Sequence, residues 1–352
     1  MITVRTLIAG CMAGALTLTV ATAFAQNTDN LIVAAKKEGA VNSLGMPADW
    51  ANWQDTWAQL TQKYGLKHQD TDLSSAEEIA KFETEKNNAS GDIGDVGYTF
   101  APVAVQKGVT QPYKPTTWNQ IPAWAKDKDG QWLVSYTGTI AFIVNNKLVK
   151  NPPKTWADLL KGKYKVALGD VSTSARASSA VLAAAYALGG NEKNLKPALD
   201  LFAQLAKQGR LTLNDPNIAN LEKGEVEVGI QWDFNALAYR DKIDRSRFDV
   251  SIPQDGSLTY GYSTIINKYA KHPNAAMLAR EYILSDAGQV NLARGYARPI
   301  RAEVRIPQDI AAKLLPAAQY RVARPIGDIA AWENTQKQLP RQWQEQVIVN
   351  MQ

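Results

Sequence analysis

Three hydroxyl side chains and an arginine follow one another where a short strand is expected to lead into an alanine-rich helix. They lie in the segment Gly169-Asp170-Val171-Ser172-Thr173-Ser174-Ala175-Arg176. The exposed amides and the dipole at a helix start favour a negative group, and a guanidinium adds a planar fork suited to phosphonate, phosphate or carboxylate. We therefore expect an anion site made of Ser172, Thr173, Ser174 and Arg176. The alternative is that one hydroxyl only caps the helix.

Four other segments at the ends of expected strands carry carboxylates and aromatic rings instead. Ligands of open α/β sheets bind beyond the carboxyl ends of strands, so these segments are further candidates for a binding site. Their candidate ligand-binding residues are Met46, Asp49, Trp50, Asp95, Tyr98, Thr99, Trp232, Asp233, Tyr260 and Tyr262. Carboxylates pair with an ammonium, and aromatic rings stack on it. The alternatives are helix capping for Asp49 and Asp233 and core packing for Trp50 and Tyr98.

The two groups of candidates favour ligand groups of opposite charge. The segment at 172–176 suits an anion, whereas the carboxylates of Asp95 and Asp233 tolerate a cation. A zwitterion with a phosphonate or carboxylate at one end and an amine at the other satisfies both groups. A sugar phosphate would use only the first group and a polyamine only the second, so these alternatives stay open.

The residue types present in the chain give no support to catalysis, metal binding or nucleic-acid binding. His68 and His272 are the only histidines, and neither lies in a metal-ligand or catalytic-triad pattern. Cys11 is the only cysteine, and the common nucleophile, zinc-protease and nucleotide-binding motifs are absent. The formal charge of +5 is spread along 352 residues, which disfavours a nucleic-acid interface. We therefore expect a binding protein without enzymatic activity, cofactor or metal site.

The first twenty-five residues predict export. Arg5 precedes an apolar run over 7–20, and Ala23-Phe24-Ala25 has the small-x-small pattern of a cleavage site. The run is too short for a membrane-spanning helix. Cleavage would start the mature chain at Gln26, outside the cytoplasm, and the lack of disulfides favours a bacterial periplasm. The alternative is a lipoprotein signal that ends at Cys11.

Strand-like and helix-like segments alternate along the rest of the chain, which predicts an α/β class with largely parallel sheets. Helices are expected over 30–38, 49–64, 75–88, 101–107, 156–160, 177–188, 195–208, 274–284 and 286–296. Strands are expected over 40–44, 93–97, 132–136, 140–145, 165–168, 226–231, 248–252 and 264–266. Ser74 and Glu77 have the spacing of a capping box. Gly261 indicates a tight turn before the last strand.

Four segments resemble the periplasmic solute-binding proteins of ABC importers. Residues 138–146 (GTIAFIVNN) are similar to a strand that crosses between the lobes in that family, and 155–160 (TWADLL) follow its P-x-T-W-x-D-L pattern. Residues 265–276 (IINKYAKHPNAA) and 282–289 (YILSDAGQ) resemble the second crossing strand and a helix pair. The similarity is greatest to the group that includes polyamine, ferric-ion, hexose-phosphate and 2-aminoethylphosphonate binders.

The resemblance implies a two-lobed periplasmic binding protein fold with two crossing strands and the ligand between the lobes. After a signal peptide at 1–25, one lobe would contain 26–136 plus 264–352 and the other 137–263. It implies a monomer that closes on one small solute and delivers it to the membrane permease of an ABC importer.

Two alternatives within the same fold follow from the resemblance. The family's iron binders carry two adjacent tyrosines, whereas Gly261 separates Tyr260 from Tyr262, so ferric ion is the less favoured ligand. A subunit that reports its ligand to a sensor kinase would have the same cleft, and the sequence leaves that function open.

Overall fold

The computed structural model describes residues 28–351. The expected signal peptide at 1–25 and the expected mature start at Gln26 lie outside the described residues. A helix over 28–38 opens the described chain and leads directly into the first strand, β1 (Ala40–Leu44).

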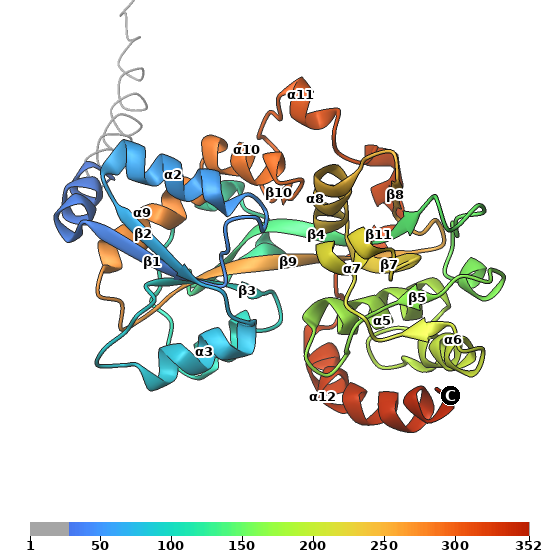
Figure 1. The fold of residues 1–352 in the computed structure, drawn as a ribbon. Coiled ribbons are helices and arrows are strands. Elements are labelled where there is room, and N and C mark those ends of the chain that lie inside the picture. Colours follow the sequence, from blue (N-terminus) through green and yellow to red (C-terminus); the bar gives the residue numbers. More distant parts are fainter. Residues whose placement is uncertain (1–27, 352) are drawn as a thin grey trace, which may run out of the picture.

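One mixed sheet runs through both halves of the molecule (Figure 1). Its strands follow the order β2-β1-β3-β9-β4-β7-β5-β6. At its centre lie two long antiparallel strands, β4 (Trp132–Asn145) and β9 (Ser257–Ile266), which pair from Trp132 with Ile265 to Thr139 with Thr259. Figure 1 shows both strands passing from one half into the other, so they join two lobes. The expected two-lobed α/β fold is confirmed, although the sheet is mixed rather than largely parallel.

The first lobe is built on parallel strands. Strand β1 pairs in parallel with β2 (Lys67–Thr71) and β3 (Ile93–Gly97), and β3 pairs antiparallel with β9. In Figure 1, α2 lies above these strands and α3 below them. The helices of this lobe are α2 (Trp53–Tyr64), α3 (Ser75–Thr84), α4 (Ala101–Gln106), α9 (Pro273–Ile283) and α10 (Asp286–Arg294), with short 3-10 turns at Trp118–Gln120 and Ala123–Ala125.

The second lobe is built around the far half of β4. This part of β4 pairs antiparallel with β7 (Val228–Trp232) and β8 (Phe248–Ser251), and β5 (Val166–Ala167) lies between β7 and β6 (Leu211–Thr212) in parallel register. Its helices are α5 (Ala175–Ala187), α6 (Lys196–Lys207), α7 (Ile218–Lys223) and α8 (Asp233–Ile243), with a 3-10 turn at Ala157–Leu160.

The last part of the chain returns from the first lobe to the second. Strand β10 (Arg298–Pro299) pairs with β4 and is followed by α11 (Gln308–Ala311), a 3-10 turn at Ala317–Val322, β11 (Ala323–Arg324), α12 (Ile329–Gln346) and a final turn at Ile348–Asn350. Strand β11 pairs with the second-lobe end of β9, at Ser257 and Leu258. Figure 1 shows α12 beside α5 and α6.

Side-chain contacts anchor α12 to the second lobe. The ring centroids of Trp343 and Phe202 on α6 are 5.3 Å apart, and Gln336 donates a hydrogen bond to Ser178 on α5 at 3.2 Å. We expected 264–352 to belong to the first lobe, but these contacts are with the second. We therefore propose a division in which 317–351 belongs to the second lobe together with 137–263.

Two glycines that look like breaks in the sequence lie inside strands. The expected separate strands 132–136 and 140–145 form one strand through Gly138, and Gly261 lies within β9 rather than in a turn. A Cβ atom at Gly138 would lie 2.5 Å from the Phe234 ring, and one at Gly261 would lie 2.7 Å from a Val134 methyl. These glycines therefore permit close packing across the crossing strands, not a change of direction.

The start of α2 also differs from the prediction, which placed it at Asp49. The helix begins at Trp53, because Ala51 and Asn52 have φ values of 47° and 60°, which a right-handed helix does not allow. Asp49 is therefore not the helix cap. The capping box at the start of α3 is confirmed, since the Ser74 amide donates to the Glu77 carboxylate at 2.8 Å.

Within residues 28–351, every helix is too short or too polar to cross a lipid bilayer.

A buried tryptophan tests the lobe to which α12 belongs. The Trp343 side chain is 2% exposed, so Trp343→Ala should lower the free energy of unfolding by about 3–5 kcal/mol, measured by chemical denaturation. Hydrogen exchange should show lost protection in α5 and α6 but not in α2 or α9. Val349→Ala is the control, because Val349 is 71% exposed. Equal loss of protection in both lobes would contradict the proposed division.

Candidate functional site

A cavity of about 310 Å³ lies between the two lobes, at the carboxyl ends of β1, β3, β5 and β7. The first lobe contributes Gly45, Pro47, Trp50, Asp72, Leu73, Ser74, Ser75, Ala76, Glu78, Asp95 and Phe100, the second contributes Thr173, Ser174, Ala175, Arg176, Asp215, Gln231 and Tyr239, and the crossing strand β9 contributes Tyr262. We call this space the interlobe cavity. Its size is at the low end of the range for ligand pockets, which suits a small solute.

The first lobe presents the start of α3 to the interlobe cavity. Ser74, Ser75 and Ala76 line it, and the first amides of a helix have no acceptor within the helix. The Ser75 hydroxyl oxygen accepts a hydrogen bond from the Gly97 amide at 3.0 Å, so its own hydrogen is available to another acceptor. This end of α3 therefore offers hydrogen-bond donors and the positive end of a helix dipole.

The second lobe presents the start of α5 to the same cavity. Ser174 is the N-cap residue, and its hydroxyl accepts the Ala177 amide at 3.2 Å. Thr173 is exposed and lines the cavity. Ser172 does not line it, because its hydroxyl donates to the Asp170 carboxylate at 2.6 Å. Of the expected anion segment, Thr173, Ser174 and Arg176 are thus brought to the cavity and Ser172 is not.

Arg176 is buried and bonded to other groups of the protein, although the sequence suggested that it would contact a ligand. Its side chain is 7% exposed, and one terminal nitrogen donates to the carbonyls of Leu168 and Ile230, each at 2.7 Å. The other terminal nitrogen forms an ion pair with Asp215. Burial lowers the pKa of Arg176, and the Asp215 carboxylate opposes that shift. The guanidinium therefore holds α5 against β5 and β7, and Asp215 balances its charge.

The opposite wall carries a carboxylate that the sequence analysis missed. Glu78 lies in the first turns of α3 and is 1% exposed, and its Oε2 accepts the Asp95 amide at 3.1 Å. Strand β2 consists of polar residues (KHQDT), which give no strand signal, so the sequence does not indicate that the segment before α3 borders a site. The capping box located the helix start, but nothing in the sequence showed that its inner face meets β3.

Asp95 ends a hydrogen-bond chain that runs through two aromatic residues. The Trp50 indole donates to the Tyr136 hydroxyl, and that hydroxyl donates to Asp95 Oδ2, both at 2.7 Å. Burial raises the pKa of Asp95 to about 8, although the hydrogen bond from Tyr136 acts in the other direction. Burial and the neighbouring Asp95 charge raise the pKa of Glu78 well above its ordinary value. The interlobe cavity therefore has two carboxyl groups that hold protons more tightly than usual.

Aromatic rings form the remaining wall. Trp50 meets Phe234 of α8 and Tyr262 of β9 edge to face, with ring centroids 5.3 and 5.5 Å apart. Tyr262 in turn stacks on Tyr136 at 5.5 Å. Since Trp50 belongs to the first lobe and Phe234 to the second, this cluster is a point of contact between the lobes.

Five of the expected site residues lie in the core rather than at the cavity. Met46 and Trp232 are fully buried, and Trp232 stacks on Tyr260 with centroids 5.6 Å apart. The Tyr260 hydroxyl bonds to the Thr99 side chain at 2.8 Å, and the Tyr98 hydroxyl donates to the Trp124 carbonyl at 3.1 Å. The rings of Trp232, Tyr260 and Tyr98 lie on β9 or against it, so contacts within the protein account for their positions.

The two remaining expected carboxylates also lie away from the interlobe cavity. Asp233 is fully buried, where Oδ1 accepts the Thr139 amide at 2.7 Å and Oδ2 accepts the Tyr320 hydroxyl. It is the first residue of α8 and not its N-cap, which is Trp232. Asp49 lies at a neighbouring hollow of about 210 Å³, with its carboxylate 3.9 Å from the Lys242 ammonium of the second lobe.

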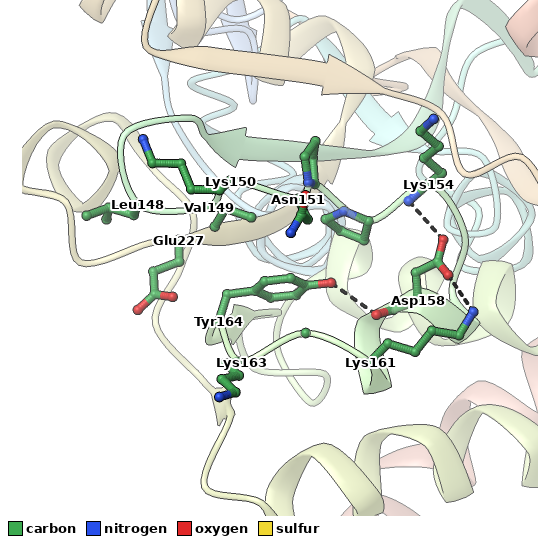
Figure 2. Close-up of a pocket in the computed structure, with 13 residues that line it drawn as sticks. Leu148, Val149, Lys150, Asn151, Lys154, Asp158, Lys161, Lys163, Tyr164 and Glu227 are labelled. Atoms are coloured by element: carbon green, nitrogen blue, oxygen red, sulfur yellow. Dashed lines mark hydrogen bonds and ion pairs between the residues drawn. The ribbon is translucent and has the colours of Figure 1, made fainter.

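A larger hollow of about 790 Å³ lies on the second lobe alone (Figure 2). Its charged lining includes four exposed lysines, at positions 150, 154, 161 and 163. Figure 2 shows the Tyr164 hydroxyl donating to the Asp158 carbonyl (3.1 Å) and Lys161 paired with the Asp158 carboxylate (2.9 Å). Because one lobe provides the whole wall, closure of the lobes would not enclose a ligand there. The interlobe cavity is therefore the better candidate.

Within residues 28–351, no three histidine, cysteine, aspartate or glutamate side chains are grouped so that they could hold a metal ion.

The chain is similar to proteins that bind different solutes. It is 28% identical to the sulfate-binding protein of Escherichia coli over 179 residues, which are 48% of this chain and 53% of that protein. It thus spans about half the length of the sulfate-binding relatives that it matches.

Among solved structures, two show the same two-lobed fold. One is the periplasmic binding protein AfuA of Actinobacillus pleuropneumoniae with bound fructose-6-phosphate (TM-score 0.72, 19% identity, 88% of this chain and 98% of that one). The other is the spermidine/putrescine transporter substrate-binding protein PotD of Streptococcus pneumoniae (TM-score 0.67, 15% identity, 87% and 98%).

The model of one protein family matches residues 92–324, which is more than half of the chain. This span includes both crossing strands and the second-lobe wall of the interlobe cavity, whereas most of the first-lobe wall, from Gly45 to Glu78, precedes it. The chain therefore belongs to the family of bacterial extracellular solute-binding proteins.

Proposed function

We propose that this protein is the periplasmic solute-capturing component of an ABC importer. It binds one small anionic or zwitterionic solute in the interlobe cavity and delivers it to a membrane permease. The anionic group is a phosphonate, a phosphate ester or a carboxylate. The observation that carries this proposal is that two helix starts, those of α3 and α5, face the same cavity from opposite lobes.

Two facing helix starts suit an anion for an electrostatic reason. Each supplies unpaired amides and a partial positive charge, and the cavity adds the hydroxyls of Ser75 and Thr173. An anion between them would contact both lobes at once. Binding would thus stabilise the closed arrangement, which is the form that a permease recognises.

The named ligands of similar proteins are compatible with this assignment. The Escherichia coli relative is a sulfate-binding protein, and the AfuA structure contains a sugar phosphate. Both ligands are anions, although PotD is named for polyamines and shares the same fold. The fold therefore supports capture of a small solute, and the helix starts support the choice of an anion.

A thermal-shift screen tests the ligand class. The panel is 2-aminoethylphosphonate, fructose 6-phosphate, sulfate, small carboxylates, putrescine and ferric citrate. A ligand that binds only the folded state raises the melting temperature by mass action. At one hundred times its Kd, it adds about 2.7 kcal/mol to the free energy of unfolding. We expect a shift with at least one phosphonate, phosphate or carboxylate. A shift with putrescine or ferric citrate alone would contradict the anion assignment.

A matched pair of variants tests the anion site at α5. Thr173→Val removes a hydroxyl that faces the cavity, whereas Ser172→Ala removes one that is bonded to Asp170. Loss of a hydrogen bond to a charged ligand is worth about 1.5–3 kcal/mol. Titration calorimetry should therefore show about ten- to hundredfold weaker anion binding in Thr173→Val and little change in Ser172→Ala. Equal affinity in the two variants would exclude Thr173 from the site.

A further inference from the structure

We infer that Glu78 and Asp95 together form a subsite for a protonated amine of the solute. This inference rests on the proposed function, because the two carboxyl groups line the same interlobe cavity as the two helix starts. This subsite would select an aminated solute over the analogue that lacks the amine.

The Glu78 carboxyl occupies a space that the backbone keeps free for it. A Cβ atom at Gly45 would lie 2.2 Å from Glu78 Oε1, and one at Gly94 would lie 2.5 Å from Oε2. Any larger residue at either position would displace the carboxyl. The residue after β1 and the second residue of β3 thus leave room for one acidic side chain that projects from α3.

The pair has an unpaired acceptor at this wall of the cavity. Glu78 Oε2 accepts the Asp95 amide and Asp95 Oδ2 accepts the Tyr136 hydroxyl, but the buried Asp95 Oδ1 has no hydrogen-bond partner among residues 28–351. Asp95 is 3% exposed and Glu78 is 1% exposed, so bulk water offers these two carboxyl groups few hydrogen bonds. A buried polar group without a partner is costly in a folded protein, and a ligand donor would remove that cost.

Within residues 28–351, no lysine, arginine or histidine forms an ion pair with Glu78 or Asp95. The neighbouring carboxylates of Asp95, Asp70 and Asp72 all raise the pKa of Glu78. Asp70 and Asp72 approach from the end of β2, and Asp70 accepts hydrogen bonds from Ser43 and the Met46 amide. From β4 and β9, Tyr136 and Tyr262 face Asp95 and bring no positive charge.

Among the described residues that line the cavity, the one buried cation, Arg176, belongs to the opposite wall. Arg176 lies on the second lobe, and Asp215 already pairs with it. The carboxyl groups without a paired cation therefore lie on the first-lobe wall only. An ammonium group placed there would contact Asp95 Oδ1 and the Glu78 carboxyl, with the rings of Trp50 and Tyr262 alongside.

Amine binding at this subsite should release a proton. Burial holds a proton on the pair at neutral pH, since the pKa of Asp95 is raised to about 8 and that of Glu78 is raised well above 4.5. When an ammonium enters, it favours the ionised carboxyl. One carboxyl O–H bond then breaks, the proton passes to water, and the ammonium keeps its own protons.

Paired ligands that differ only in the amine test this subsite. We would titrate 2-aminoethylphosphonate against ethylphosphonate, and 4-aminobutyrate against butyrate, by calorimetry at pH 7. We expect the aminated member of a pair to bind about ten- to hundredfold more tightly. In buffers of different ionisation enthalpy, amine binding should release about one proton, and the amine-free analogue should release none.

Three variants assign this preference to residues. Glu78→Gln and Asp95→Asn keep shape but lose the ionisable group, so both should abolish the amine preference while retaining ethylphosphonate binding. Glu77→Gln is the matched control, because Glu77 is exposed, faces Ser74 and can cap α3 as glutamine. It should keep the full preference.

The outcomes separate the subsite from the proposed function. Binding of ethylphosphonate without any gain from the amine would overturn the ammonium subsite and leave the anion site standing. If no anion bound but putrescine bound in a Glu78-dependent manner, the anion site would be wrong and the ammonium subsite would stand. Loss of preference in Glu77→Gln as well would overturn the assignment to the pair.

The stability of the ligand-free protein gives an independent readout. The folded-state pKa of Asp95, about 8, lies above its ordinary value of 3.8, so the unfolded chain loses this proton first as the pH rises. The free energy of unfolding therefore falls between about pH 4 and pH 8. Melting curves should show that Asp95→Asn raises the melting temperature more at pH 8 than at pH 5. A constant difference across this range would contradict a protonated pair.

Discussion

The antiparallel pairing of β4 with β9 is the constraint on which the two lobes and the space between them depend. Both strands continue from one half of the sheet into the other, so the lobes share backbone hydrogen bonds. Tyr136 lies on β4, Tyr262 lies on β9, and Asp95 lies on β3 opposite Thr264 of β9. The cavity wall is therefore attached to the strands about which the lobes would move. The C-terminal segment is held to the second lobe as well, because the Tyr320 hydroxyl donates a hydrogen bond to the buried Asp233.

The charges in the interlobe cavity are divided unequally between its walls. On the second lobe, Arg176 and Asp215 balance each other and also fasten α5 to the sheet. On the first lobe, Glu78 and Asp95 are buried side by side, and no described residue forms an ion pair with either of them. Groups with strongly shifted pKa values that lie in a cleft often belong to functional sites. This asymmetry explains why a guanidinium prominent in the sequence is structural, whereas a glutamate without any motif faces the cavity.

Similarity to known proteins determines the architecture of this chain more firmly than its ligand. Proteins named for sulfate, a sugar phosphate and polyamines share its sequence or its fold at low identity. Their common part is the pair of lobes and the crossing strands. The cavity is lined by strand ends and helix starts, where few side chains need to change for a different solute to bind.

The sequence by itself determined the family, the two-lobed α/β class and most helices, because these depend on local periodicity and contiguous motifs. It could not determine which rings face the cavity, since Tyr260 and Tyr262 lie on one strand and only packing separates their roles. It also missed β2, whose polar pattern depends on pairing with β1, and hence the approach of Glu78 to Asp95. The contacts of α12 with the second lobe join residues more than one hundred positions apart. Such contacts depend on the tertiary packing of segments that are far apart in the sequence, and no local sequence pattern predicts them.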